Sequence, residues 1–138
     1  MRAFLDANVL FSSAIGGASF ELLWELAATA RIELVTSSYC LVEATTNLKR
    51  KAPEALARLE PKLRWVAMVA EAPEYAEWAM VLVEEKEAAV LASARGAKAD
   101  ALVTGDLKHF GALMKRDDLP LKVMTVRELL LRGPGVPR

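Results

Sequence analysis

Residues 32–50, IELVTSSYCLVEATTNLKR, combine one strand and one helix, and this unit decides the fold class. Ile32–Val35 is a short apolar run, which predicts a strand. Thr36–Ser38 supplies hydroxyl groups of the kind that cap the N-terminus of a helix. A helix is then predicted from about Tyr39–Arg50, before Pro53 interrupts it. A strand that leads directly into a helix is the repeating unit of a parallel α/β sheet.

The alternation of strand and helix continues in both directions from this unit. Dipeptides typical of tight hairpins are absent between the strands, which favours a parallel sheet covered on both faces. Gly96 is predicted to cap one helix, Gly133-Pro134 is predicted to end the last one, and the type of Trp65–Val69 stays open. The other predicted strands are Ala3–Leu5, Ala101–Thr104 and Leu121–Met124, and the other predicted helices are Phe20–Ala30, Pro53–Leu59, Pro73–Leu82, Glu87–Arg95 and Thr125–Leu131.

The length and composition predict one domain without a membrane segment. At 138 residues the chain fits a single hydrophobic core, so we expect one domain over residues 1–132 and a short tail over 133–138. No window approaches the ~18 uncharged apolar residues that span a bilayer, and no signal peptide is recognisable. We therefore expect a cytoplasmic protein. Cys40 is the single cysteine and has neither a disulfide partner nor a nearby Cys or His for zinc.

The charge is balanced over the chain but uneven along it. Eighteen acidic residues match eighteen basic ones. Between Lys49 and Arg64, six basic residues and two acidic ones give a local charge of +4, whereas six glutamates and one lysine between Glu71 and Glu87 give −5. One face is therefore suited to phosphate and another to cations. The alternative, that both runs are ordinary solvated helix faces, stays open.

Polar residues follow several predicted strands. In a parallel α/β sheet, ligands bind beyond the carboxyl ends of the strands. Asp6 and Asn8 follow the first strand, Thr36-Ser37 follows the second, and Gly105-Asp106 follows Ala101–Thr104. Asp100 precedes that same strand, and six residues at ~3.3 Å each place it about 20 Å from Asp106, which excludes it from a shared site.

Each candidate acid also has an explanation that needs no ligand. The Asp6–Asn8 stretch can form a turn. Asp106 can cap a short helix that runs through His109, a residue better explained by packing or surface exposure than by a binding role. Glu43 lies in the middle of a helix, where glutamate is usually solvated. Glu87 lies in a first helical turn, which favours an acid through the helix dipole.

Taken together, the strand-end and helix acids point to a hard divalent cation. Clustered carboxylates bind Mg²⁺ or Mn²⁺, with water and phosphate filling the remaining positions. Several carboxylates at one sheet edge would repel each other strongly without a cation. The sequence offers no competing Ser, His and Asp arrangement, and Gly16-Gly17 lies too far past the first strand for a dinucleotide fingerprint.

Four segments of the chain resemble a known family. They are FLDANVL (4–10), LVEATTNL (41–48), KEAAVLASA (86–94) and ADALVTGDLKHF (99–110). In this order they are similar to the PIN-domain ribonucleases that include the VapC toxins. The resemblance implies a three-layer α/β/α sandwich with a mainly parallel central sheet. It also implies Mg²⁺- or Mn²⁺-dependent hydrolysis of phosphodiester bonds in single-stranded RNA.

The resemblance also assigns the site by position. The acids it implies as metal-binding and catalytic are Asp6, Glu43, Glu87 and Asp106, with Asn8 and Thr104 as orienting groups. The third acid departs from the pattern, because many relatives carry aspartate where this chain has the longer Glu87, and Glu84 and Glu85 lie close enough to be rivals. Lys49, Arg50 and Lys51 are expected to contact RNA phosphates.

The resemblance further implies an antitoxin protein as partner and a homodimer or higher homo-oligomer. Two other functions stay open. One is a non-catalytic PIN scaffold that binds RNA or protein. The other is a receiver-like phosphoacceptor, which would need paired acids at the first strand and a lysine after the last. Here Asp6 is unpaired, and Met124-Thr125 stands at the end of the last strand.

Overall fold

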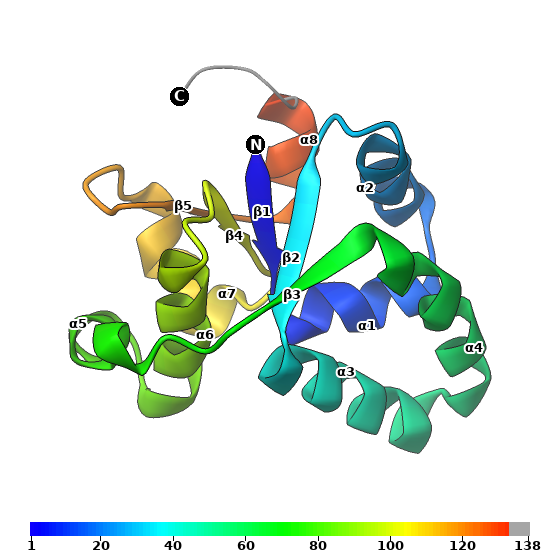
Figure 1. The fold of residues 1–138 in the computed structure, drawn as a ribbon, viewed down its shortest axis with the longest axis horizontal. Coiled ribbons are helices and arrows are strands. Elements are labelled where there is room, and N and C mark those ends of the chain that lie inside the picture. Colours follow the sequence, from blue (N-terminus) through cyan, green and yellow to red (C-terminus); the bar gives the residue numbers. More distant parts are fainter. Residues whose placement is uncertain (133–138) are drawn as a thin grey trace.

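The computed structural model describes residues 1–132 and contains one sheet of five strands surrounded by helices (Figure 1). The predicted tail over 133–138 lies outside the described residues. The strands are β1 (Arg2–Leu5), β2 (Glu33–Ser37), β3 (Val66–Val69), β4 (Ala101–Val103) and β5 (Lys122–Met124). The helices are α1 (Ala7–Ile15), α2 (Ala18–Ala28), α3 (Ser38–Lys51), α4 (Leu56–Leu59), α5 (Ala76–Leu82), α6 (Glu85–Gly96), α7 (Leu107–Phe110) and α8 (Val126–Arg132), with 3₁₀ turns at Pro53–Ala55, Glu60–Trp65, Pro73–Tyr75 and Gly111–Lys115.

All neighbouring strands run parallel, in the order β3-β2-β1-β4-β5. The chain moves outward from β1 to β2 and β3, then returns to the other side of β1 for β4 and β5. The order therefore reverses between β1 and β4, where Leu5 pairs with Val103. Such a reversal is the place where parallel α/β sheets bind ligands. The expected α/β class with a parallel sheet is confirmed.

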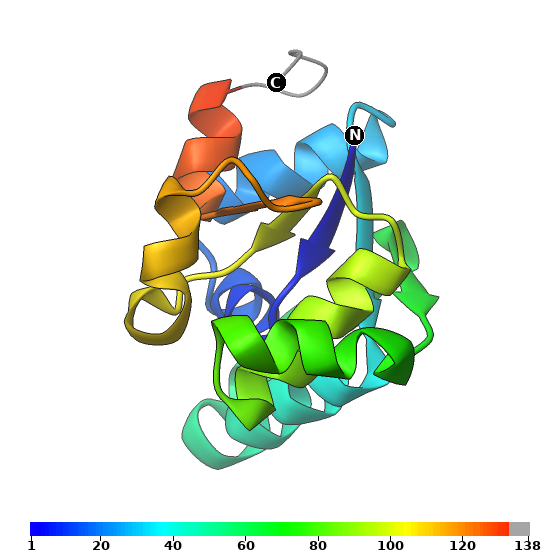
Figure 2. The ribbon, with the colours of Figure 1, turned by 90° about the vertical axis from the view of Figure 1, so that its left-hand side faces the viewer.

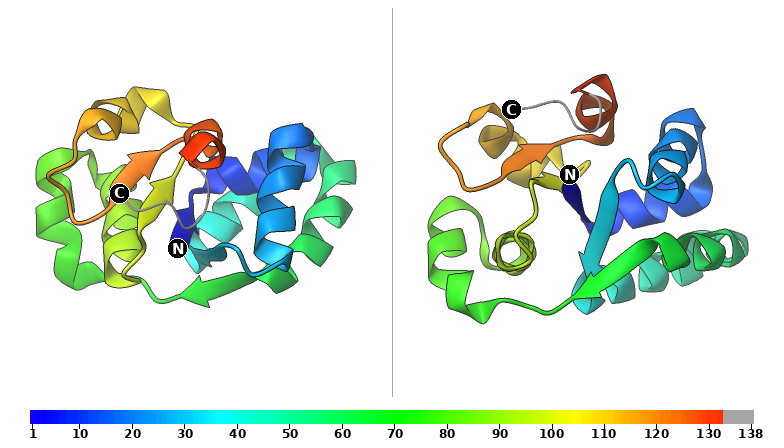
Figure 3. Two further views of the ribbon diagram at one scale, coloured as in Figure 1. Left: turned by 90° about the horizontal axis from the view of Figure 1, so that it is seen from above. Right: turned by 45° about the horizontal axis from the view of Figure 1, so that its top comes forward.

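Helices cover both faces of the sheet. Helix α6 packs against β2 and β4, and α5 packs on α6. Helices α2 and α8 contact each other across the opposite face, as the views in Figures 2 and 3 show. Because both faces are covered, β1 and β4 carry continuous apolar runs rather than an alternating pattern, and Ala3, Phe4 and Leu5 of β1 are fully buried. A smaller core, formed by Ala14, Leu48, Ala55 and Leu59, joins α1, α3 and α4.

Helix α1 was not predicted from the sequence, which suggested only a turn or a ligand at Asp6–Asn8. Asp6 is the N-cap of α1 and accepts a hydrogen bond from the Ala7 N–H. Gly16 and Gly17 end the helix with φ angles of 106° and 128°, which glycine adopts at little cost. Within residues 1–132 no single helix is long and apolar enough to cross a membrane. The bent pair α1–α2 reaches the length and apolar composition of a membrane span only when the two helices are taken together.

Most other elements match the prediction within a few residues. Trp65–Val69, whose type was left open, contributes the edge strand β3. Strand β2 is longer than predicted and includes Thr36 and Ser37, and Ser37 caps α3 as expected. The capping box at the start of α8 is also confirmed, because Thr125 and Glu128 bond each other's backbone N–H at 3.0 and 3.1 Å.

Gly96 does not cap α6, contrary to the prediction. It is the last residue inside the helix, and Ala97 is the cap. A Cβ atom at Gly96 would overlap the Cβ of Ala72, in the segment that leads into α5. The glycine is therefore explained by the close approach of two segments rather than by a left-handed backbone conformation.

Candidate active site

The four predicted acids line one pocket of about 100 Å³ at the carboxyl ends of β1 and β4. Asp6 follows β1, Asp106 follows β4, Glu43 comes from α3 and Glu87 comes from α6. The remaining residues in its wall are Asn8, Tyr39, Lys86, Val90, His109 and Phe110. Side chains that are up to 100 positions apart in the sequence (Asp6 to Asp106) thus meet where the strand order reverses.

Asp6 is the more buried of the two acids that follow strands, with 7% of its surface exposed. Its Oδ1 accepts from the Ala7 N–H at 2.8 Å, and its Oδ2 accepts from the Thr104 hydroxyl at 2.8 Å. Burial raises the pKa of Asp6 above its ordinary value, the bonds from Thr104 and Ala7 oppose this, and the charge of Glu43 adds to it. A bound cation would stabilise this carboxylate.

Asn8 and Thr104 connect the two strand-end acids. The Asn8 amide donates to Asp6 Oδ2 at 3.1 Å and to the Thr104 hydroxyl at 3.2 Å. Its own oxygen accepts from the Gly105 N–H at 2.7 Å. The Thr104 hydroxyl, which is fully buried, also accepts from the Asp106 N–H at 3.1 Å. Every polar side-chain atom of Asn8 and Thr104 therefore helps to fix the loop after β4 relative to Asp6.

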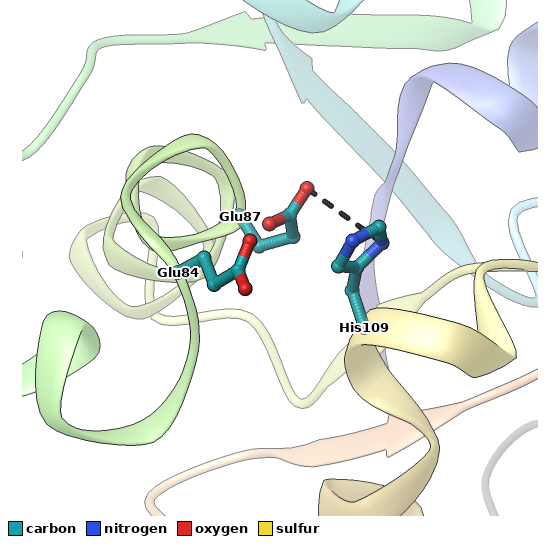
Figure 4. Close-up of side chains that lie close together, drawn as sticks. All are labelled: Glu84, Glu87 and His109. Atoms are coloured by element: carbon teal, nitrogen blue, oxygen red, sulfur yellow. Dashed lines mark ion pairs between the residues drawn. The ribbon is translucent and has the colours of Figure 1, made fainter.

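Glu87, rather than Glu84 or Glu85, lines the pocket. Only 7% of its surface is exposed, whereas Glu84 and Glu85 are exposed at the start of α6. Glu84 nevertheless lies nearby, because it, Glu87 and His109 each offer a ligand atom within 4.8 Å of the others. Figure 4 shows these three side chains gathered between α6 and α7. The longer Glu87 side chain therefore reaches the same pocket as the strand-end acids.

His109 was assigned no binding role from the sequence, and the structure places its side chain in the pocket wall. Its ring nitrogen Nδ1 lies 2.8 Å from Asp106 Oδ2 and 3.9 Å from Glu87 Oε2. Asp106 is also the N-cap of α7 and accepts from the His109 N–H, as predicted. The possible N-cap at Asp106 could have predicted this contact, because the residue three positions after an N-cap lies next to the capping side chain.

Lys86 and Tyr39 complete the wall beside Glu43. Lys86 Nζ lies 3.6 Å from Glu43 Oε2 and is 63% exposed, so this cation stands at the mouth of the pocket. Burial and the charge of Glu43 raise the pKa of the Tyr39 hydroxyl. Neither residue was predicted from the sequence, and a lysine among three glutamates gave no signal that it would face the site.

The donor set fits a hard divalent cation. Its side chains offer carboxylate oxygens from four elements, and Lys86 is the one cationic side chain in the described pocket wall besides the titratable His109. Carboxylate oxygens are the ligands that Mg²⁺ and Mn²⁺ prefer. The buried Asp6 and Glu87 would otherwise hold like charges in a poorly solvated space.

Other candidate residues lie away from this pocket. Asp100 accepts from the Arg2 N–H at the start of β1, as its exclusion predicted. Thr36 donates to the Leu5 carbonyl inside the sheet rather than facing the acids, and Ser37 caps α3. Lys49–Lys51 are exposed at the end of α3 and do not line the pocket.

Part of the basic run has a structural explanation. Arg58 donates to the Ala14 carbonyl at 2.9 Å, and Lys62 lies 5.9 Å from the centre of the Trp24 ring. Such contacts anchor α4 and the following turn to α1 and α2. Arg58 and Lys62 are thus engaged in contacts within the protein, and only part of the basic run is available to bind a ligand.

The domain is a parallel α/β sandwich, and its acids gather where the strand order reverses. These two features define its class. The sequence model of the PIN domain family matches residues 2–108, a range that includes all four acids. The chain belongs to the PIN domain family.

Several solved structures are similar to the chain, and two of them illustrate the likeness. One is the crystal structure of VapBC2 from Rickettsia felis bound to a DNA fragment from their promoter, with a TM-score of 0.67 and 19% identity over 91% of this chain and 98% of that one. The other is a toxin-antitoxin complex from Klebsiella pneumoniae, with a TM-score of 0.61 and 18% identity over 87% and 98%. No curated protein sequence matches the chain. These likenesses extend the agreement in fold to nearly the whole chain.

Proposed function

We propose that this chain is a Mg²⁺- or Mn²⁺-dependent endoribonuclease that hydrolyses phosphodiester bonds in single-stranded RNA. The observation that carries the proposal is the convergence of Asp6, Glu43, Glu87 and Asp106 on one small pocket. Membership of the PIN domain family supports nuclease activity in general. Four carboxylates that converge in this way are suited to cation-assisted phosphoryl chemistry.

The cation would be held by Asp6 and Asp106 directly, and by Glu43 and Glu87 directly or through water. When bound, it supplies the Lewis acidity that polarises a phosphate oxygen and lowers the pKa of water. The bound ion attracts the carboxylates and offsets their mutual repulsion, and both effects contribute to its binding free energy.

The remaining side chains act on the substrate and on the acids. Asn8 and Thr104 hold the Asp6 carboxylate through bonds of 3.1 and 2.8 Å, so that its position does not depend on the substrate. Lys86, exposed at the pocket mouth, is placed to contact a phosphate oxygen once Glu43 engages the cation. The pocket thus provides oxygen ligands inside and a positive charge at its entrance.

Lys49–Lys51 would add contacts to phosphates farther along the RNA strand. These residues follow Glu43 on α3 and are exposed. Contacts of this kind strengthen binding regardless of base sequence and weaken with salt. If simultaneous replacement of the three by alanine leaves RNA affinity unchanged, they are an ordinary solvated surface.

We further propose that the chain is the toxin of a toxin-antitoxin pair and forms a homodimer or higher homo-oligomer. The support is the likeness to chains in two toxin-antitoxin complexes. Co-purification of a small protein encoded by an adjacent gene, and the mass of the purified assembly, test these two statements.

Cleavage of a mixed RNA pool tests the proposed activity. We expect cleavage by the purified protein in Mg²⁺ or Mn²⁺, loss of cleavage with chelator, and loss of cleavage in an Asp6→Asn variant. Cleavage that persists in the variant would place the activity elsewhere or in a contaminant. RNA binding without metal-dependent cleavage would instead favour a non-catalytic scaffold.

A further inference from the structure

His109 contacts both carboxylate oxygens of Asp106. Its backbone N–H donates to Asp106 Oδ1 at 3.1 Å, and its ring Nδ1 lies 2.8 Å from Asp106 Oδ2. An ionised carboxylate can only accept hydrogen bonds, so Nδ1 carries the hydrogen in this contact. A single residue therefore restrains the rotation of the Asp106 carboxylate.

The Asp106 carboxylate has fewer hydrogen-bonding partners than the Asp6 carboxylate, so the contact with His109 matters more for its position. The Asp6 oxygens accept from Ala7, Asn8 and Thr104, and from the more distant Cys40 thiol at 3.9 Å. The Asp106 side chain is 27% exposed and stands before a helix of four residues. Among residues 1–132, the hydrogen bonds to its carboxylate oxygens both come from His109.

The imidazole of His109 also links Asp106 to a second acid. Its Nδ1 lies 3.9 Å from Glu87 Oε2, the contact drawn as a dashed line in Figure 4. Glu87 belongs to α6 and Asp106 precedes α7, so the ring lies between carboxylates from two separate elements. Those two elements meet in the acidic pocket.

We propose that His109 is a positioning residue that fixes the Asp106 carboxylate, and its spacing from Glu87, in the arrangement that binds the cation. The inference rests on the proposed function, since it takes both acids as cation ligands. A ligand held in place before binding loses less conformational freedom when the ion arrives. Hydrogen-bonding partners of metal ligands commonly change metal affinity by about 10–100-fold.

The test is the Mn²⁺ affinity of the whole chain, measured from the electron paramagnetic resonance signal of free Mn²⁺. The variants are His109→Ala, His109→Asn and His109→Gln, with the exposed neighbour Lys108→Ala as a matched control on the same helix. The amide nitrogen of asparagine reaches the position of Nδ1, whereas that of glutamine reaches the position of Nε2. Unfolding temperatures of all variants establish that each one is folded.

We expect His109→Ala to weaken Mn²⁺ binding by about 10–100-fold, as for other partners of metal ligands. His109→Asn should restore most of the affinity, His109→Gln should not, and Lys108→Ala should bind as the unchanged protein does. An alanine variant with unchanged affinity would overturn the proposal. Equal rescue by asparagine and glutamine would also overturn it, because the donor at Nδ1 would then be irrelevant.

RNA cleavage by the same samples separates this inference from the proposed function. The expected affinity pattern without any cleavage by the unchanged protein would overturn the ribonuclease and retain the positioning role. Cleavage by the unchanged protein with equal Mn²⁺ affinities in all variants would overturn the positioning role alone. An unchanged protein that binds no Mn²⁺ would overturn both.

Discussion

At the residue scale, Asp6 and Asp106 each combine a helix cap with a place in the pocket wall. Asp6 caps α1 and Asp106 caps α7, and the carboxylate of each also lines the acidic pocket. The two explanations for these residues, cap and site, are therefore compatible. A cap fixes the side chain relative to the backbone, and this gives a ligand its defined position before any ion binds.

Thr104 is the residue on which both strand-end acids depend. Its hydroxyl donates to Asp6 and accepts from the Asp106 N–H, inside the protein. We expect Thr104→Val to lower the free energy of unfolding by about 1–3 kcal/mol, because the buried Asp6 carboxylate loses a donor and the partly buried Asp106 N–H loses its acceptor. Thr104→Ser should retain most of that stability and of any RNA cleavage. Urea denaturation measures the difference, and equal stability of the valine and serine variants would contradict this role.

We expect the buried thiol of Cys40 to lower the free energy of unfolding as the pH becomes alkaline. The residue is fully buried, and burial raises the pKa of its thiol from 9.0 to about 12. As the pH rises above about 9, the unfolded chain loses this proton before the folded one, so the contribution of the thiol to stability declines between about pH 9 and 12. The stability difference between the unchanged protein and Cys40→Ala should therefore shrink from pH 8 to pH 10.5 in denaturation experiments. A difference independent of pH would contradict the raised pKa.

At the scale of elements, the alternation of strands and helices was predictable because it depends on local signals. Apolar runs marked β1, β2, β4 and β5, hydroxyl residues marked the starts of α3 and α8, and prolines marked the 3₁₀ turns that lead into α4 and α5. Helix α1 was missed because its cap, Asp6, was considered as a turn or a ligand, although Gly16 and Gly17 marked its end. Local signals cannot report a close approach between distant segments, which is why Gly96 was misinterpreted.

A pair of glycine substitutions tests the packing of α6 at this scale. Gly96→Ala should lower the free energy of unfolding by about 1–3 kcal/mol, because the new methyl group overlaps Ala72. This loss should exceed the gain of up to about 1 kcal/mol that alanine brings to a helix.

Gly111→Ala is the matched control for this test. No atom lies within 4 Å of a Cβ built at Gly111, which has a helical backbone, so the substitution should be neutral or stabilise by up to about 1 kcal/mol. Thermal unfolding compares the two variants. Equal effects would contradict the close contact between α6 and the segment before α5.

At the scale of the whole molecule, acidic and basic residues balance, but negative charge is concentrated in the pocket at the sheet edge. The chain carries eighteen acidic and eighteen basic residues, yet the pocket gathers four carboxylates beside Lys86. The four acids that the family resemblance assigned to the site line this pocket, because parallel strands and their helices bring them to one sheet edge. Lys86 and Tyr39 could not be predicted, since their orientation depends on how α3 and α6 pack, whereas the N-cap at Asp106 was a local signal for the position of His109.

The central claim is that these four acids, and not their neighbours, carry out RNA cleavage. The direct test is the single-turnover cleavage rate, at saturating Mn²⁺, of four variants: Asp6→Asn, Glu43→Gln, Glu87→Gln and Asp106→Asn. Glu85→Gln and Lys108→Ala are the matched controls, because these exposed residues lie close to Glu87 and Asp106 in the sequence and do not line the pocket. We predict losses of about 100-fold or more in the pocket variants, as expected when an electrostatic group of the reaction is removed, and changes within about threefold in the controls. Unchanged cleavage in the pocket variants, or an equal loss in the controls, would contradict the account.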